Sequence, residues 1–393
     1  MKKRTQTKFL TRCIAVLLML AAMGSLFTAC GGNTEPDELP TDEITEAPTD
    51  AEEEGDQGGE LITEPIFYEL NSSTKGIKIL GERYLASSAV INCDWTGSGI
   101  EMDVDHHGGD IIFTATATAD CLFRVYVDGE AWEQGSYEDP TYYKVTKNLT
   151  HIKLNDVPAG EHRIKVIKVT GYTIARAQIC YVEFCGTICE TAPEKNEMYI
   201  EFVGDSISCG WGNIGNHGGA YTDQDGTLAY PLMIADRLNA DYAVTALSGQ
   251  GLIYGPACTV TEGYLYGSAL RSKSEKFAFE RKADIVVINI GTNDYSQRNN
   301  QNIDKAKFKA AYLAFLRTVA EKNGPNCQIY CLYNTMNDTF KDAIIEAVAE
   351  FGGEAKNAYT YQMTRANGNQ HPNLAEHEQY TEDLLTLMGY ADW

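Results

Sequence analysis

A strand that runs straight into a polar turn is the feature that most constrains how this chain folds. Residues 199–203 (Y-I-E-F-V) are apolar, aromatic and β-branched enough for a strand, and Gly204 permits a sharp turn that a side chain would obstruct. Ser206 then lies just past the carboxyl end of the strand, where ligands bind in open α/β sheets. Ser206 is therefore a candidate nucleophile. The alternative is an ordinary turn in which Asp205 or Ser206 caps the next helix.

Strands and helices alternate through the C-terminal half of the chain. Apolar runs predict strands at 199–203, 242–247, 284–290, 328–333 and 358–362, and helical periodicity predicts helices at 227–239, 305–322, 338–351 and 374–388. Strands that alternate with helices form a parallel sheet covered on both faces, with right-handed crossovers. We therefore expect residues 197–393 to form a doubly wound α/β domain.

Four residues of complementary chemistry fall at one predicted edge of that sheet. Three strands end in turns that carry Ser206, Gly249 and Asn293, and the last loop carries His371. Parallel strands place their carboxyl ends together, so these residues can meet. His371 can serve as the base for a serine nucleophile, and the Gly249 backbone N–H and the Asn293 amide can stabilise an oxyanion. This set predicts acyl transfer and implies neither a metal nor an organic cofactor.

The region 61–190 has the pattern of an all-β domain. Short alternating runs predict strands at 111–118, 122–127, 162–169 and 179–184, and Asp128-Gly129 is typical of a tight hairpin turn. We expect an antiparallel β-sandwich of the jelly-roll type, joined to the second domain by a linker at 191–197. Its aromatic residues could stack on sugar rings or could simply pack in the core: Trp95, Trp132, Tyr137, Tyr142 and Tyr143.

The N-terminus has the pattern of an export signal. Basic residues precede an apolar run at 13–23, too short to span a membrane, and small residues lead to Cys30. Residues 1–30 resemble a bacterial lipoprotein signal with Cys30 as the lipidation site, although Phe27 stands where leucine is most usual. A simple cleaved signal is the alternative. Residues 31–60 hold about a dozen acidic residues and no Lys or Arg, which predicts a disordered tether. We expect a lipid-anchored protein on the extracellular face of the cell membrane.

Charge and cysteine spacing exclude several other classes. The formal net charge of −23 and the pI near 4.7 argue against nucleic acid as a partner, since binding to phosphates needs a basic face. Cys185 and Cys189 lack a second pair or nearby histidines, so zinc is not expected. His106 and His107 are adjacent strand residues that point to opposite faces. We expect a monomer without a metal.

Four short motifs carry a family resemblance. They read Gly204-Asp205-Ser206-Ile207, Ser248-Gly249-Gln250-Gly251, Gly291-Thr292-Asn293-Asp294 and Gln370-His371-Pro372. In this order they resemble the four blocks of the SGNH (GDSL-type) hydrolases, which implies a flavodoxin-like three-layer α/β/α domain. The wording of residues 204–213 and the preceding jelly roll resemble carbohydrate esterase family 2.

The resemblance implies a reaction and a role for each residue. Members of that family remove O-acetyl groups from xylan and glucomannan, with a serine like Ser206 as the nucleophile and a histidine like His371 as the base. The backbone N–H groups of Ser206 and Gly249 and the Asn293 side chain match the oxyanion hole. Acetylated polysaccharide is then the expected partner. The substrate-contacting aromatics would be Trp211, with packing of the nucleophile turn as its alternative, Tyr254 and Tyr295.

The chain departs from the family pattern next to His371, and two other functions remain open. Many SGNH enzymes carry an aspartate just before the histidine, but this chain has Gly368, Asn369 and Gln370 there. A backbone carbonyl within 365–370 is the expected orienting partner for His371, ahead of Asn369 or Asp294. The alternative functions are an esterase of the same mechanism acting on peptidoglycan, lipid or another acyl ester, and a non-catalytic surface protein that binds glycans.

Overall fold

The structure is a computed structural model that describes residues 62–135, 139–215, 220–255, 257–268, 276–366 and 370–391. The predicted signal, Cys30 and the acidic tether therefore lie outside the described residues. Residues Gly59–Trp393 form one compact unit. Within the described ranges, no helix combines the length and the apolar character that crossing a membrane requires.

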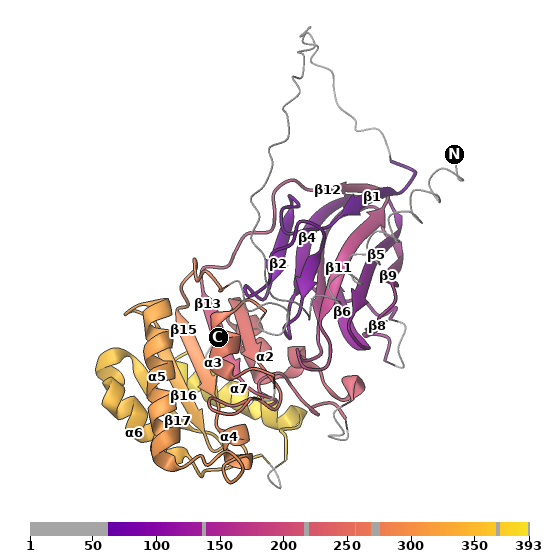
Figure 1. Ribbon diagram of the computed structural model, residues 1–393. Coiled ribbons are helices and arrows are strands. Elements are labelled where there is room, and N and C mark those ends of the chain that lie inside the picture. The colour runs from indigo at the N-terminus through magenta and orange to yellow at the C-terminus, as the bar shows by residue number, and fades with distance from the viewer. Residues whose placement is uncertain are drawn as a thin grey trace, which may run out of the picture. The chain divides into compact units, whose positions relative to one another are not determined.

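The first part of this unit is a β-sandwich of two antiparallel sheets (Figure 1). Its strands are β1 (Ile66–Glu69), β2 (Ile77–Leu80), β3 (Ile91–Cys93), β4 (Gly99–His106), β5 (Gly109–Ala117), β6 (Cys121–Val127), β7 (Glu130–Ala131), β8 (Tyr143–Val145), β9 (Thr150–Val157), β10 (Gly160–Lys168), β11 (Ala177–Phe184) and β12 (Gly186–Ile188). One sheet has the order β1-β11-β5-β9, with β3 on β11. The other has the order β12-β4-β10-β6-β7, with β2 on β4 and β8 on β6.

Alternation of apolar and polar residues builds the sandwich core. On β4, Ile100, Met102 and Val104 are fully buried while the residues between them are more exposed. They share one hydrophobic core with residues of both sheets, as the two-residue period of a strand requires. Asp128 and Gly129 both have positive φ, of 53° and 89°, between β6 and β7, which fits the hairpin turn expected there. The predicted antiparallel sandwich is confirmed.

The second part is a five-stranded parallel sheet with the order β14-β13-β15-β16-β17. Its elements are β13 (Tyr199–Gly204), α2 (Tyr230–Arg237), β14 (Asp241–Ala246), α3 (Val260–Leu265), β15 (Ile285–Asn289), α4 (Thr292–Ser296), α5 (Lys305–Asn323), β16 (Gln328–Tyr333), α6 (Lys341–Phe351), β17 (Ala358–Gln362) and α7 (Leu374–Met388). The order is that of a flavodoxin-like sheet, which confirms the predicted doubly wound fold. Its topological switch point lies between β13 and β15.

Two hydrophobic cores cover the two faces of this sheet. One core joins β13, β15 and β16 to α3, α5 and α6, and the other joins the strands to α2 and α7. Figure 1 shows α5 and α6 on the opposite side of the strands from α2. All five residues of β15 are buried, which explains the unbroken apolar run in the sequence.

The helix expected at 227–239 is wrong at its start. Residues Gly226–Leu228 form a 3₁₀ turn capped by Asp225, whose side chain accepts from the Thr227 N–H. Ala229 is extended (φ −103°, ψ 152°), so the α-helix begins only at Tyr230, with Pro231 in its first turn. A side-chain cap and one extended residue thus interrupt a pattern that reads as continuous helix.

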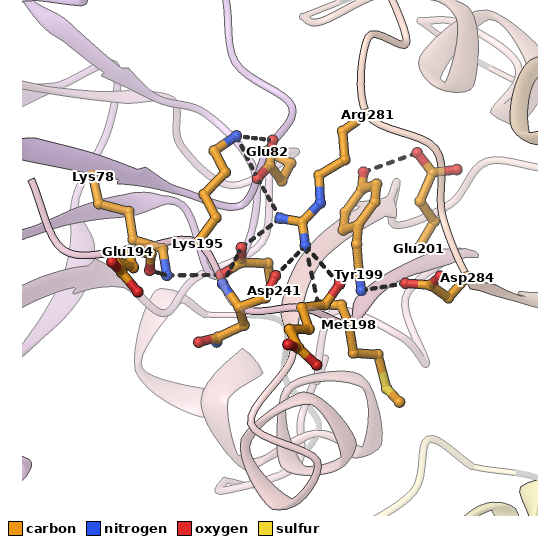
Figure 2. A network of polar contacts seen from close by, with 12 residues as sticks. Lys78, Glu82, Glu194, Lys195, Met198, Tyr199, Glu201, Asp241, Arg281 and Asp284 are labelled. Atoms are coloured by element: carbon orange, nitrogen blue, oxygen red, sulfur yellow. Dashed lines mark hydrogen bonds and ion pairs between the residues drawn. The ribbon is translucent and has the colours of Figure 1, made fainter.

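A polar network joins the two parts of the unit (Figure 2). The Arg281 guanidinium bonds to Glu82 of the sandwich, to Asp241 at the start of β14 and to the Asn196 carbonyl of the linker. Lys78 of β2 pairs with the same Asp241 at 2.8 Å. Charges from three distant segments therefore converge where the linker enters the sheet.

Beside this network, a buried ion pair explains the charged residue within β13. Glu201 has no exposed surface, and its Oε1 lies 2.7 Å from an Nη atom of Arg83, which is 1% exposed. Tyr199 and Tyr264 donate their hydroxyls to the same carboxylate, at 3.0 and 2.8 Å. Burial is the largest single influence and opposes the charge of Arg83, but Glu201, Tyr264 and Tyr199 together outweigh it and raise the pKa of the guanidinium. A side chain from the sandwich part thus neutralises the buried charge on β13.

Candidate active site

Ser206 and His371 meet at the carboxyl edge of the parallel sheet. The Nε2 atom of His371 lies 2.7 Å from the Ser206 Oγ, although the two residues are 165 positions apart. Ser206 follows β13 and is 5% exposed, while His371 precedes α7 and is half-buried. A Cβ atom on Gly204 would lie 2.1 Å from the Ser208 Oγ, so the turn needs glycine there. The distance suits proton transfer from a serine nucleophile to a histidine base.

Asn293 ties together three of the loops at this edge. Its Nδ2 atom donates to the Gln250 carbonyl at 2.9 Å and to the Asp205 carboxylate at 3.2 Å. Asn293 lies in the first turn of α4, which follows Gly291 (φ 131°) at the end of β15. One amide thus connects the nucleophile turn with the loop that contains Gly249.

Asp294 holds the loop that follows Gly249, a role that sequence reasoning missed. Its fully buried carboxylate accepts the backbone N–H groups of Leu252, Ile253 and Tyr254 at 2.9, 2.8 and 3.2 Å. Burial nevertheless raises the pKa of this carboxyl above its usual range. Asp294 was a possible orienting partner for His371. Its oxygens are instead bonded to this loop, and its place beside Asn293 in the motif was the available signal.

The two glycines of this loop serve different purposes. Gly249 has φ +81°, and a Cβ added there would meet nothing within 4 Å, so the backbone conformation requires glycine and the adjoining space is open. A Cβ on Gly251 would lie 2.4 Å from an Asp294 carboxylate oxygen, so close approach requires glycine there. Glycine therefore lets the loop lie against the start of α4.

Asp205 places a carboxyl group directly beneath the nucleophile. It has no exposed surface, and its Oδ1 accepts the Ile207 N–H at 3.0 Å. Burial raises the pKa of Asp205 to about 7. The hydrogen bond from the Ile207 N–H acts in the opposite direction, and the negative charge of Asp294 raises the pKa further. The group that accepts from Asn293 therefore titrates near neutral pH.

Residues expected to orient His371 fall largely outside the described ranges. Gly368 and Asn369 are not described, so the expected backbone carbonyl stays a prediction. A second histidine, His377, lies buried on α7, where burial and the nearby His371 lower its pKa to about 3. It accepts the Tyr230 N–H at 3.3 Å through Nδ1. His377 is thus a neutral core residue behind the site.

Of the three predicted substrate aromatics, the structure brings Trp211 next to the Ser206–His371 pair. Its ring centroid is 6.2 Å from that of His371, and its backbone N–H donates to the Ser206 carbonyl at 3.0 Å. Tyr254 and Tyr295 are partly buried against the core that covers α5 and α6. The Arg298 guanidinium lies 3.9 Å from the centre of the Tyr295 ring and covers one face. Trp211 is therefore the strongest candidate for contact with a substrate.

The sandwich aromatics mostly serve packing. Trp95 is 1% exposed and donates to the Gly267 carbonyl at 2.7 Å, and Tyr142 and Tyr143 are buried. Trp132 is half-buried, and Tyr137 lies outside the described residues. The packing alternative therefore holds for Trp95, Tyr142 and Tyr143.

The adjacent histidines His106 and His107 are hydrogen-bonded to backbone groups of the sandwich part. The two ring nitrogens of His106 lie 2.9 and 3.2 Å from the carbonyls of Cys185 and Gly109, and His107 accepts the Ile62 N–H. Within the described ranges, no group of three or more His, Cys, Asp or Glu side chains is arranged to hold a metal ion.

Comparison with known proteins agrees with this geometry. Residues 202–387 match the model of the GDSL-like lipase/acylhydrolase family, a range that contains Ser206, Gly249, Asn293 and His371. Residues 202–387 are a GDSL-type (SGNH) hydrolase domain. A family two carbohydrate esterase from Clostridium thermocellum, solved with cellohexaose, is 26% identical to this hydrolase, with a TM-score of 0.68 over 80% of this chain and all of that one.

Two curated relatives of the hydrolase match over only part of their own length. The cellulase/esterase CelE of Acetivibrio thermocellus is 28% identical over 324 residues, which cover 76% of this chain and 38% of that protein. An acetylxylan esterase/glucomannan deacetylase of Cellvibrio japonicus is 24% identical over 216 residues, 49% of this chain and 58% of the relative. The hydrolase thus spans well under two thirds of the length of these two proteins.

Proposed function

We propose that this hydrolase is a serine esterase that removes O-acetyl groups from plant cell-wall polysaccharides such as xylan and glucomannan. The observation that carries the proposal is the 2.7 Å contact between the Ser206 hydroxyl and His371 Nε2 at the carboxyl edge of the sheet. The activities of the relatives, an acetylxylan esterase/glucomannan deacetylase and a cellulase/esterase, support the substrate class.

In the acylation step, His371 Nε2 takes the proton of the Ser206 hydroxyl while Oγ attacks the acetyl carbonyl carbon. The resulting oxyanion is stabilised by the backbone N–H groups of Ser206 and Gly249 and by the Asn293 amide. The bond to the sugar oxygen then breaks, and that oxygen receives the proton from His371. The products of this step are the free sugar hydroxyl and an acetyl ester on Ser206.

In the deacylation step, His371 takes a proton from a water molecule that attacks the acetyl ester. The second oxyanion uses the same donors, and its collapse returns the proton to Ser206 Oγ and releases acetic acid, which ionises to acetate in solution. Every proton passes through Nε2 of one histidine, so the orientation of this ring controls both steps. In the serine-protease template, loss of that control costs about 10⁴-fold in rate.

Release of acetate from acetylated xylan and p-nitrophenol from its acetate ester tests the reaction. We expect Ser206→Ala to lower kcat at least about 10⁴-fold, because the nucleophile is lost. Ser73→Ala, at an exposed serine of the sandwich part, is the control and should behave like the parent. Parental rates in Ser206→Ala would show that Ser206 is not the nucleophile.

A substrate panel separates the polysaccharide proposal from other acyl esters. Acetylated xylan, acetylated glucomannan, O-acetylated peptidoglycan and a lipid ester are compared by kcat/KM, with cellohexaose added as a competitor. We expect the two plant polysaccharides to be the best substrates. A preference for peptidoglycan or lipid would reject the proposed substrate and retain the mechanism. Glycan binding without hydrolysis of any ester would reject the mechanism as well.

We also propose that Cys30 carries a lipid that anchors the enzyme at the extracellular face of the membrane, with residues 31–60 as the tether. The motif that ends at Cys30 supports this. Metabolic labelling of the full chain with an alkyne fatty acid in a bacterial host tests it. Cys30→Ser should lose the label and the control Cys185→Ser should keep it. Retention of the label in Cys30→Ser contradicts the proposal.

A further inference from the structure

The segment Gln224 to Gly226 lies between the β-sandwich and the nucleophile turn and is bonded to both. On one side, the Gly226 N–H donates to the Val169 carbonyl at 2.8 Å. On the other, the Asn213 side chain pairs with the Asp225 backbone, with Nδ2 to the Asp225 carbonyl at 2.7 Å and the Asp225 N–H to Oδ1 at 2.9 Å. Asn213 closes the turn that begins at Ser206. The position of Asp225 is thus transmitted to that turn.

Two side chains of the sandwich hold the Asp225 carboxylate. It has no exposed surface, and its Oδ2 accepts the Tyr142 hydroxyl at 2.8 Å and lies 3.2 Å from Nε of Arg124 on β6. Arg124 also donates to the Tyr142 hydroxyl at 2.9 Å, which closes a triangle. Burial is the largest single influence and opposes the charge of Arg124, but Asp225, Tyr142 and Tyr126 together outweigh it and raise the pKa of the guanidinium. The carboxylate is therefore held by a permanent positive charge and a directed hydrogen bond.

A second contact from the sandwich reaches the back of the same turn. Lys168 at the end of β10 is fully buried, and its ammonium group donates to the carbonyls of Thr170 and Gly171 at 2.6 and 3.5 Å. A Cβ on Gly171 would lie 3.2 Å from the Cys209 Sγ, which itself lies 3.4 Å from the Ser206 carbonyl. The loop fixed by Lys168 thus packs directly behind the residues that present the nucleophile.

We propose that Arg124 and Tyr142 are positioning residues for the esterase reaction, which act through Asp225 and Asn213 on Ser206. The β-sandwich then helps to position the nucleophile and is not a separable binding module. The inference rests on the proposed role of Ser206 as nucleophile. A displacement of a reacting group by about 1 Å can lower the rate about 10²-fold, so small shifts of this turn matter.

The test uses the full chain and separates positioning from stability. The variants are Tyr142→Phe, Arg124→Gln and Arg124→Lys. The matched control is Arg163→Gln, on the same sheet, where the arginine pairs at 2.7 Å with Asp103 at the surface. We measure kcat and KM for p-nitrophenyl acetate, the thermal unfolding midpoint, and the rate at which a p-nitrophenyl phosphonate forms a covalent bond to Ser206 Oγ and releases p-nitrophenol.

We expect Tyr142→Phe and Arg124→Gln to lower both kcat and the phosphonylation rate about 10- to 100-fold, with KM changed by less than about twofold. Arg124→Lys keeps the charge and should recover part of the loss. Arg163→Gln should match the parent. If Arg124→Gln shows no cooperative unfolding, Tyr142→Phe decides, since it removes one hydroxyl only.

Three results would overturn the inference. Parental kcat and phosphonylation rates in Tyr142→Phe show that the contact is dispensable. If the variant has a lower kcat only because a smaller fraction of its molecules reacts with the phosphonate, and those molecules react at the parental rate, the contact stabilises the fold without positioning Ser206. A parent whose Ser206 reacts with neither reagent rejects the proposed function and this inference together. If the parent hydrolyses no ester but its Ser206 is phosphonylated, only the proposed function fails, and the phosphonylation rates still decide on Arg124 and Tyr142.

Discussion

The Asn293 amide donates to the buried Asp205 carboxylate at 3.2 Å, directly beneath the nucleophile turn. The same nitrogen donates to the Gln250 carbonyl, so both of its hydrogens have partners before a substrate binds. An oxyanion at this site must therefore share or replace one of these contacts. Because burial raises the pKa of Asp205 to about 7, protonation of that carboxyl at mildly acidic pH weakens one competitor for the amide.

Asn293→Ala tests the amide as an oxyanion donor. We expect kcat for p-nitrophenyl acetate to fall about 10²- to 10³-fold with little change in KM, as when a single oxyanion donor is removed elsewhere. Asn300→Ala, at an exposed asparagine of the following loop, is the control. A loss of less than about threefold in Asn293→Ala would assign the amide a purely structural task.

The titration of Asp205 predicts a pH-dependent stability. Its pKa is raised from 3.8 to about 7 in the folded protein, so the neutral form stabilises the fold fully below about pH 4, and this contribution is lost as the pH rises to about 7. The difference amounts to up to about 4 kcal/mol in the free energy of unfolding.

Asp205→Asn removes this titration. Urea unfolding at about pH 5 and pH 8 should show the variant gaining stability relative to the parent as the pH rises. Asp342→Asn, at an exposed carboxylate on α6, provides the comparison. Identical pH dependence in the parent and Asp205→Asn would contradict the raised pKa of Asp205.

Trp211→Ala separates substrate contact from packing. If the indole stacks on the sugar that carries the acetyl group, kcat/KM for acetylated xylo-oligosaccharides should fall about 3- to 10-fold more than for p-nitrophenyl acetate, which matches a stacking energy of about 0.5–1.5 kcal/mol. Trp211→Phe should retain part of the preference. Equal losses with both substrates would mean that Trp211 packs the nucleophile turn and His371.

Arg83→Met tests the buried ion pair that joins the sandwich to β13. The change leaves the Glu201 carboxylate buried without its charge partner, so we expect a loss of about 3–5 kcal/mol in the free energy of unfolding. The double variant Arg83→Met/Glu201→Gln should recover much of that loss. Denaturant titration of both proteins measures it. If the double variant is no more stable than Arg83→Met, burial of the unpaired charge is not the cause.

Local sequence pattern was sufficient for most elements of the sheet domain. The strands at 328–333 and 358–362 and the helix at 374–388 coincide with β16, β17 and α7, because their apolar periodicity is unbroken and their ends carry clear signals. The predicted start of α2 was wrong, because the Asp225 cap and the extended Ala229 depend on contacts with the sandwich and with the nucleophile turn.

Site residues divide in the same way. Ser206, Gly249, Asn293 and His371 each follow a recognisable strand or precede a helix, so the sequence placed them at one edge. It could not show that Asn293 bonds to Asp205, since these side chains lie 88 positions apart. It also could not show that the Asp294 carboxylate holds the backbone of residues 252–254.

Local sequence pattern was enough to predict a parallel sheet that gathers a serine, a glycine, an asparagine and a histidine at its carboxyl edge. The support of that edge became visible only in the folded protein, where Arg83 pairs with Glu201, and Arg124 and Tyr142 pair with Asp225. The physical reason is the range of each effect. Apolar periodicity and turn chemistry act over a few residues, whereas a buried charge finds its partner only after packing brings together segments that are about a hundred residues apart.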